Sequence, residues 1–390
     1  MTTNTLKIVV DENIPYGEDA FGVLGHVITA PGRAISRELL TDADALIVRS
    51  ITQVNEALLR DTKVRFVGTC TIGEDHIDKA YLAKNAIGFS SAPGCNANSV
   101  GEYIVAALLH LSDRYGFRLE EMCLGIVGVG NVGTNVHAKA QALGMTCVLN
   151  DPPLADATGD PMYRPLHELL ECDIITLHTP LTRRGKYPSW HLVDKEVLRW
   201  LKPHAIILNS SRGSVVDNVA LEEALRTEHI RAAVLDVWEH EPTPNPRLLE
   251  ETVIATPHIA GYSFDGKVNG TRQVYEALCQ FLGRTPEWSP DDLLPPPPVP
   301  SLTINPDATA PLSGAVSAVY DIMSDDADLR GILDVPREQH AAHFDGLRKN
   351  YPVRREFYNT VVQLTRPDAI MTETLSGLGF SVCQGPENNA

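Results

Sequence analysis

The 390-residue chain carries 33 lysines and arginines against 50 aspartates and glutamates, a formal net charge of −17 at pH 7. So acidic a surface repels nucleic acid and anionic membranes, and we expect neither as a partner. Hydrophobic residues make up 43% and charged residues 21%, which is typical of a folded globular protein, and a chain of this length usually forms two or three domains.

The cysteines and the N-terminus bear on the compartment. The seven cysteines contain no C-x-x-C pair, so we expect neither a disulfide framework nor a metal site. The first residues, MTTNTLKIVVDEN, lack the basic stretch and apolar core of a signal peptide. No apolar run approaches the length of a membrane span. These features predict a cytoplasmic protein.

The first hundred residues predict a parallel α/β sheet. Four short apolar runs alternate with helix-like stretches: LKIVVDEN, ALIVRS, RFVGTCTIG and GFSSAPG. Ligands of such sheets bind beyond the carboxyl ends of the strands. The polar residues and glycines expected at those ends are Arg49, Ser50, Thr71, Gly73 and Gly94.

A second α/β unit follows. Residues 99–117 carry apolar side chains at helical spacing and predict a long helix. Six strand candidates come next: LGIVGVG, TCVLND, DIITLHTP, AIILNSSRG, AAVLDVW and VIATPHI. Strands that alternate with helices in this way fit a doubly wound sheet. Residues 260–283 then predict one further helix.

The proline-rich run DDLLPPPPVPS marks a boundary, because four consecutive prolines continue neither a helix nor a central strand. We therefore expect three domains: a ligand-binding one over residues 1–100, completed by 259–286, a second one over 101–258, and a C-terminal one over 287–390. The predicted fold class is α/β, with two doubly wound parallel-sheet (Rossmann-like) domains plus a small C-terminal α+β dimerisation domain.

The run CLGIVGVGNVG has the G-x-G-x-x-G spacing of a dinucleotide fingerprint. A tight strand-to-helix turn without a ligand would show the same three glycines. The context favours a cofactor, because a strand precedes the run, a helix follows, and Asp151 ends the next strand, where a carboxylate binds ribose hydroxyls. That charge would repel a 2′-phosphate, and no arginine follows before Arg164, so NAD is favoured over NADP. We therefore expect residues 101–258 to form an NAD-binding domain and residues 1–100, with 259–286, to form a substrate-binding domain.

Three further strand ends carry residues capable of acid–base chemistry and anion binding: Arg212, Glu241 and His258. Each has an ordinary alternative, namely a surface ion pair, a loop carboxylate before Pro242, or a structural histidine. Three such residues downstream of one fingerprint are better explained by a joint role in catalysis.

The segments GVGNVG, HTPL, SSRGSVVD, VLDVWEHEP and TPHIAGYS resemble those of the D-isomer-specific 2-hydroxyacid dehydrogenases. The resemblance implies that His258 is the acid–base group, that Glu241 orients it, and that Arg212 binds the substrate carboxylate. It further implies two sets of contacts. The cofactor would lie against Gly128, Gly130, Asn131, Val132, Gly133, Asp151, Thr179, Ser210, Ser211, Asp236 and Gly261. The substrate would contact Arg49, Ser50, Thr71, Gly73 and Tyr262.

Other segments, including FVGTCTIGEDHID and LRKNYPVRREF, are similar to one branch of this family, whose substrate is a small, phosphorylated and therefore anionic D-2-hydroxy acid. Two alternatives stay open at this point. One is another dehydrogenase of the family, such as a glycerate or 3-phosphoglycerate dehydrogenase. The other is a non-catalytic NAD-sensing binding protein, such as a transcriptional corepressor, since the fold alone does not imply catalysis.

The tail is expected to make the protein a homodimer, because a small domain buries little surface by itself and two-fold pairing is common. We expect a second copy to cover its apolar residues, among them Leu312, Val316, Val319, Tyr320, Ile332, Leu333, Phe344 and Leu347. The basic cluster in the tail has two interpretations, surface ion pairs or a contact with a substrate phosphate. Its members are Arg348, Lys349, Arg354 and Arg355.

Overall fold

The computed structural model describes residues 6–384, and its contacts divide the chain into two compact units. Unit 1 takes the residues up to Asn96 together with Ser263–Pro296, and unit 2 takes Ala97–Tyr262 together with the residues from Pro297 onward. Each unit is described by itself below. The division into three domains stays a prediction.

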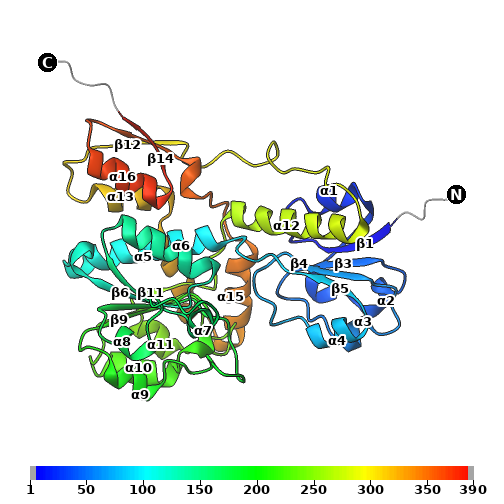
Figure 1. Cartoon of the computed structure of the whole chain (residues 1–390), viewed down its shortest axis with the longest axis horizontal. Coiled ribbons are helices and arrows are strands. Elements are labelled where there is room, and N and C mark those ends of the chain that lie inside the picture. Colours follow the sequence, from blue (N-terminus) through cyan, green and yellow to red (C-terminus); the bar gives the residue numbers. More distant parts are fainter. Residues whose placement is uncertain (1–5, 385–390) are drawn as a thin grey trace. The chain divides into compact units, whose positions relative to one another are not determined.

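Unit 1 is built on a five-stranded parallel sheet in the order β2-β1-β3-β4-β5 (Figure 1). The order reverses between β1 and β3, and such a switch point opens a crevice at the carboxyl ends of the strands. The strands are β1 Leu6–Asp11, β2 Gly25–Ala30, β3 Ala45–Val48, β4 Phe66–Thr69 and β5 Gly88–Ser90. The sequence analysis missed β2, because this edge strand is only partly buried and lacks a continuous apolar run.

Helices cover both faces of this sheet, and two separate apolar cores lie beneath them. The helices of the unit are α1 Gly17–Gly22, α2 Arg37–Leu40, α3 Glu56–Leu59, α4 Lys79–Lys84 and α12 Phe264–Leu282, with a short 3-10 turn at Gly32–Ala34. The predicted helix over 260–283 begins later than expected. Ser263 caps its N-terminus by accepting a hydrogen bond from the N–H of Gly266 at 2.8 Å.

Unit 2 contains a six-stranded parallel sheet in the order β11-β10-β9-β8-β6-β7. Its strands are β6 Cys123–Val127, β7 Thr146–Asn150, β8 Ile174–Leu177, β9 Ile206–Asn209, β10 Ala232–Leu235 and β11 Ile254–Ala255. Tyr163 forms a parallel bridge to Leu149 of β7. That bridge stands where the third strand of a doubly wound sheet would lie. With β6 counted as the first strand and β7 as the second, the order follows the 3-2-1-4-5-6 pattern, and its switch point lies between β6 and β8.

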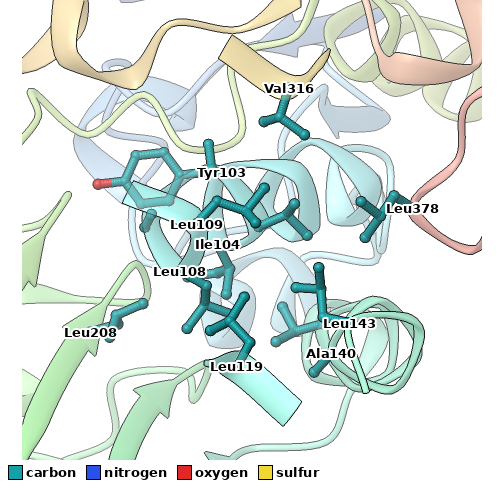
Figure 2. Packing of buried hydrophobic residues seen from close by; sticks show 14 of the residues in the cluster. Tyr103, Ile104, Leu108, Leu109, Leu119, Ala140, Leu143, Leu208, Val316 and Leu378 are labelled. Atoms are coloured by element: carbon teal, nitrogen blue, oxygen red, sulfur yellow. The ribbon is translucent and has the colours of Figure 1, made fainter. Parts of the chain in front are cut away.

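The long helix α5 is covered on nearly all sides, as its apolar composition predicts. Figure 2 shows Ile104 and Leu108 of this helix in one cluster with Ala140 and Leu143 of the α6 region. The helices on the α5 face of the sheet are α5 Ala97–Tyr115 and α6 Asn131–Ala142. The remaining helices before the C-terminal part are α7 Pro152–Thr158, α8 Leu166–Leu169, α9 Lys195–Trp200, α10 Asn218–Arg226 and α11 Pro246–Glu251, with 3-10 turns at Leu119–Glu121 and Gly213–Val215.

The C-terminal part of unit 2 is a parallel three-stranded sheet with intervening helices, which confirms the small additional sheet domain of the predicted fold class. Its elements are β12 Ser301–Ile304, α13 Pro311–Val319, α14 Ile322–Arg330, α15 His340–Lys349, β13 Val361–Leu364, α16 Ala369–Leu378 and β14 Ser381–Gln384, with 3-10 turns at Gly331–Asp334, Arg337–Gln339 and Phe357–Asn359. In Figure 1, α13 and α16 lie against α5 and α6.

The prediction that a second copy covers the apolar residues of the tail is wrong for this set. Val316 and Tyr320 pack into the α5 core, and Ile332 and Phe344 pack into the core on the opposite face of the sheet. Figure 2 shows Val316 beside Tyr103 and Leu109. The other four residues are partly buried against the same two cores. Long-range packing within the chain therefore satisfies these side chains.

Across the described range, 6–384, no helix combines the length and the apolar character needed to cross a membrane.

Candidate active site

The dinucleotide fingerprint forms the turn between β6 and α6. Gly128 adopts a left-handed backbone conformation, with φ of 87°, and its N–H donates to the carbonyl of Asn150 at 2.8 Å. A Cβ on Gly133 would lie 1.9 Å from the carbonyl oxygen of Gly128, whereas a Cβ on Gly130 would meet no atom within 4 Å. Gly133 is therefore required by the packing of the turn itself, and Gly130 leaves open space above its backbone.

That open space fits a dinucleotide. The second glycine of the motif lets the backbone approach a pyrophosphate, and the first amides of α6, with Asn131 and Val132 in its first turn, point toward this end. At the next strand end along the sheet, Thr179 follows β8, and its Oγ1 is buried with no hydrogen-bond partner among the residues described. A bound cofactor would fill the open space above Gly130 and would give the Thr179 hydroxyl a hydrogen-bond partner.

Asp151, predicted to bind ribose, organises the fingerprint turn. Its Oδ2 accepts the N–H of Val129 at 2.8 Å, and its Oδ1 accepts the N–H of Leu154 at 3.0 Å and so caps α7. Each carboxylate oxygen has two lone pairs, so both retain capacity for a ligand. The carboxylate is partly exposed at the carboxyl edge of β7.

The serines after β9 differ in their contacts. Ser210 Oγ lies 3.4 Å from Nδ1 of His178, while the Ser211 hydroxyl is buried and donates to Oδ1 of Asn209 at 2.8 Å. Desolvation lowers the pKa of His178 to about 3, so its ring is neutral. Ser211 therefore shapes the loop that carries Arg212, and Ser210 with His178 presents an uncharged polar surface.

Arg212 and His258 occupy equivalent places on neighbouring strands. The register pairs Leu235 of β10 with Asn209 of β9 on one side and with Ala255 of β11 on the other. Arg212 lies three residues beyond Asn209, and His258 lies three residues beyond Ala255. Because parallel strands end at one edge of the sheet, the structure brings both residues to the same edge.

Glu241 reaches this edge from the loop after β10. Its Oε2 lies 2.8 Å from Nδ1 of His258, and its Oε1 accepts the N–H of Trp238 at 2.8 Å. Burial alone would raise the pKa of Glu241, but the facing imidazole, the two hydrogen bonds and the charge of Arg348 outweigh it and lower that pKa. Glu241 is thus an anion that holds the imidazole ring.

Asp236 is almost fully buried and holds the loop that carries His258. Its Oδ1 accepts from the Thr256 hydroxyl and from the N–H of Ile259, both at 2.7 Å, and its Oδ2 accepts from the N–H of Ala260 at 3.0 Å. Burial raises its pKa despite these three donors. Gly261, one residue further on, is partly exposed at the end of this loop. The cofactor contacts predicted for Asp236 and Gly261 stay predictions.

In unit 1, the predicted substrate residues gather at the carboxyl ends of β3 and β4. The Arg49 guanidinium donates to the carbonyl of Asn13 at 3.1 Å, and Ser50 beside it is exposed. The Thr71 hydroxyl donates to the carbonyl of Gly73 at 3.1 Å. The sequence analysis missed Asp11, which ends β1 at this edge and is buried, because one carboxylate after a strand carries no distinctive signal.

The basic cluster of the tail divides in the structure. Arg354 and Arg355 are buried, so surface ion pairs do not describe them. Arg354 donates to the carbonyls of Ser99 and Ala260 and lies over the ring of Tyr320. Lys349 is exposed. Arg348 lies over the ring of Tyr262, a predicted substrate contact. The sequence analysis offered a contact with the substrate phosphate for this cluster but did not say which member would make it.

Comparison with known proteins agrees with this geometry. A model of the D-isomer specific 2-hydroxyacid dehydrogenase, NAD binding domain, matches residues 105–260. A domain of unknown function matches residues 293–379. The chain is 48% identical over 383 residues to the erythronate-4-phosphate dehydrogenase of Escherichia coli O7:K1, which covers 98% of this chain and 100% of that protein. It is 47% identical, with the same coverage, to the erythronate-4-phosphate dehydrogenase of Shigella flexneri serotype 5b.

Solved structures share the fold of the larger part of the chain. The D-lactate dehydrogenase of Aquifex aeolicus, solved with NAD and lactic acid, is 24% identical with a TM-score of 0.59 and covers 71% of this chain and 95% of its own. The TT0316 protein of Thermus thermophilus is 26% identical, with a TM-score of 0.61 and coverages of 72% and 98%. The fingerprint turn, the strand-end residues and these similarities lead to one conclusion. The chain belongs to the D-isomer-specific 2-hydroxyacid dehydrogenases with an NAD-binding domain, in the group of the erythronate-4-phosphate dehydrogenases.

Proposed function

We propose that this protein oxidises 4-phospho-D-erythronate to (R)-3-hydroxy-2-oxo-4-phosphooxybutanoate with NAD, a step in the biosynthesis of pyridoxal 5′-phosphate. The observation that carries the proposal is the Glu241–His258 pair at the edge of an NAD-binding sheet. The choice of substrate rests on the relatives, which match this chain over their full length.

His258 acts as the general base in this proposal. A carboxylate only accepts hydrogen bonds, so Nδ1 carries the proton shared with Glu241, and Nε2 is left to take the proton of the C2 hydroxyl. The proton held by His258 becomes an imidazolium charge, which the Glu241 anion stabilises. NAD, when bound, accepts the hydride that leaves C2.

Arg212 binds the carboxylate of the substrate and polarises the oxygen on C2. One guanidinium nitrogen, Nη1, donates to the carbonyl of Ser211 at 2.7 Å, which anchors the planar group at the sheet edge. The guanidinium carries five donors in a fixed fork, and a carboxylate matches two of them. Arg49, Ser50, Thr71, Gly73 and Tyr262 remain the candidate contacts for the rest of the substrate.

The proposal is tested by spectrophotometric assay of NADH with purified protein. We expect turnover of 4-phospho-D-erythronate and much lower kcat/KM for D-erythronate, D-glycerate and 3-phosphoglycerate. The reverse reaction, with NADH and the 2-oxo product, is measured in parallel so that slow release of NADH does not hide activity. Preference for 3-phosphoglycerate would assign the protein to another activity of the family. Absence of turnover in both directions, with NADH bound, would indicate a binding protein.

The homodimer and the cytoplasmic location also belong to the proposal. We infer that the C-terminal part of unit 2 supplies the dimer contact, because apolar side chains remain exposed there: Ile370 at 80%, Tyr358 at 48% and Val361 at 38%. The strand β13 alternates exposed and buried residues, so its outer face is open to a partner. All seven cysteines are free, which suits a reducing compartment.

Surface substitution tests the dimer better than truncation does, since removal of the tail would expose the core around Val316. Light scattering should give twice the monomer mass for the unaltered chain, and Val361→Glu with Ile370→Glu should give the monomer mass. Val219→Glu, on an apolar residue 73% exposed on α10, is the matched control. A dimer that survives the double substitution would place the contact elsewhere.

A further inference from the structure

The C-terminal part brings a cation to the candidate active site. Arg348 lies at the last turn of α15, and its Cζ is 5.5 Å from the centroid of the Tyr262 ring. Tyr262 follows His258 by four residues. It meets Tyr351 edge to face, with ring centroids 5.8 Å apart and planes at 85°. Tyr351 in turn donates its hydroxyl to Asp325 at 2.8 Å. The end of α15 is thus anchored against the loop that carries the general base.

The guanidinium of Arg348 retains one buried donor that the protein does not satisfy. Its Nε is buried and has no hydrogen-bond partner among the residues described. Within the same described range, no ion pair joins it to a carboxylate at salt-bridge distance. A buried donor without an acceptor is costly, so such a group is usually kept for a ligand.

The charge of Arg348 acts at the proposed catalytic pair, Glu241 and His258. It helps to lower the pKa of Glu241, and Tyr262 and Glu241 in turn raise the pKa of Arg348, although burial opposes this. Arg348 is therefore a cation close to Glu241 and Tyr262. Its neighbours in the basic cluster are placed differently. Arg354 also has two buried donors without a partner among the described residues, but its Nη2 is held by two backbone carbonyls, it lies over the ring of Tyr320, and its charge acts on Glu102 and Asp325. Lys349 is exposed.

We propose that Arg348, beside Tyr262, binds the phosphate group of the substrate. This inference rests on the proposed function and assigns a task to a chain segment that the family models describe as a domain of unknown function. A phosphate dianion accepts two parallel hydrogen bonds from a guanidinium, which would satisfy the buried Nε and an adjacent nitrogen. In a chain with a net charge of −17, a phosphate site requires such a local cation.

A purely structural role makes different predictions. If Arg348 served only to hold Tyr262 or to set the charge of Glu241, its loss would affect every substrate equally and would shift the pH profile of kcat. If it binds phosphate, the loss depends on whether the substrate carries one. Specificity, measured as the ratio of kcat/KM for 4-phospho-D-erythronate to kcat/KM for D-erythronate, separates the two roles.

The experiment compares Arg348→Gln, Arg348→Lys and Lys349→Gln with the unaltered protein. Arg348→Gln should reduce the specificity ratio on the order of 10²-fold, the range typical of a truncated, buried charge partner. Arg348→Lys keeps the positive charge but loses the paired donors of the guanidinium, so its specificity ratio should lie between those of Arg348→Gln and the unaltered protein. Lys349→Gln removes the same charge one residue away and should leave the ratio unchanged. An equal loss for both substrates, or no loss, would overturn the proposal.

Failure of the proposed function is recognised separately. If the unaltered protein does not prefer 4-phospho-D-erythronate, the assigned substrate is wrong, and the phosphate site is then judged by binding. The probe is inorganic phosphate, added with NADH, and the readout is the rise in Tm that a ligand of the folded state produces. The unaltered protein and Lys349→Gln should show the rise, and Arg348→Gln should not. A rise of the same size in Arg348→Gln, or none in the unaltered protein, would overturn the inference.

Discussion

Oε2 of Glu241 lies 2.8 Å from Nδ1 of His258, although the two residues follow different strands. Two hydrogen-bonded groups fix this relationship from either side. Trp238 donates its N–H to Glu241, and Asp236 accepts from the backbone of the loop beyond His258. The imidazole is therefore held by its Nδ1, and its other nitrogen is available to the substrate.

His258→Asn should lower kcat by about 10²–10⁴-fold, the usual contribution of a general acid–base group. Binding of NADH should change little, because the fingerprint turn lies on other strands. Steady-state kinetics and NADH fluorescence titration measure the two quantities. His240→Asn, an exposed histidine next to Glu241, is the control and should retain full activity. A His258→Asn protein within a small factor of the unaltered kcat would remove this residue from the mechanism.

Gly130→Ala and Gly133→Ala should fail in different ways. A Cβ at position 133 would collide with a backbone carbonyl, so Gly133→Ala should destabilise the fold by about 1–3 kcal/mol. A Cβ at position 130 meets open space, so the free energy of unfolding of Gly130→Ala should stay within about 0.5 kcal/mol of the unaltered value.

The Gly130→Ala protein should nevertheless bind NAD on the order of tenfold more weakly, since its methyl group occupies the space for the pyrophosphate. Chemical denaturation and NADH titration give the two readouts. If both substitutions lower stability and leave cofactor affinity intact, the turn is a structural feature and the cofactor site lies elsewhere.

Asp151→Asn should narrow the preference for NAD over NADP on the order of tenfold, because it removes the charge that repels a 2′-phosphate. Asparagine also caps helices, so the hydrogen bond to Leu154 can persist, while the Val129 N–H loses its acceptor because an amide nitrogen only donates. The loss at Val129 affects both cofactors, so the ratio between them is the readout. The measurement is kcat/KM with each cofactor. Asp156→Asn, an exposed carboxylate on α7, should leave the ratio unchanged. Equal use of both cofactors by the unaltered protein would contradict the role of Asp151.

Glu102 should make the protein less stable as the pH rises. Burial, and then the charge of Glu356, raise the pKa of Glu102 from 4.5 to about 8, while Arg354 and Lys139 oppose the shift. Between these two values the folded state keeps a proton that the unfolded state has lost. The free energy of unfolding therefore falls with pH, by up to about 1.4 kcal/mol per pH unit.

Glu102→Gln should flatten this dependence. Compared with the unaltered chain at the same pH, it should gain more stability at pH 8 than at pH 5. Denaturant midpoints at both pH values provide the measurement. Glu171→Gln, on an exposed carboxylate, should reproduce the dependence of the unaltered protein. A parallel shift of the Glu102→Gln protein at both values would assign the effect to packing instead of titration.

The chemistry of the strand ends could be read from the sequence because it depends on local patterns. Buried parallel strands are continuous apolar runs, and the residue types that follow them are those that reach the ligand edge. The fingerprint glycines, Asp151, Arg212, Glu241 and His258 were found in this way. The edge strand β2 was not, since a partly exposed strand carries a weaker apolar signal.

Only the tertiary structure decided what the tail contacts. Val316 and Phe344 are apolar whether a second copy or the chain's own helices cover them, so composition does not distinguish these partners. Arg348 and Tyr262 are far apart in the sequence and meet through packing of α15. The sequence by itself determined the fold class and the cofactor turn, because short-range periodicity and spacing encode them. It also predicted catalytic roles for Arg212, Glu241 and His258 through its resemblance to the family. The contact between the C-terminal cation and the site depends on long-range packing, which no local pattern reports.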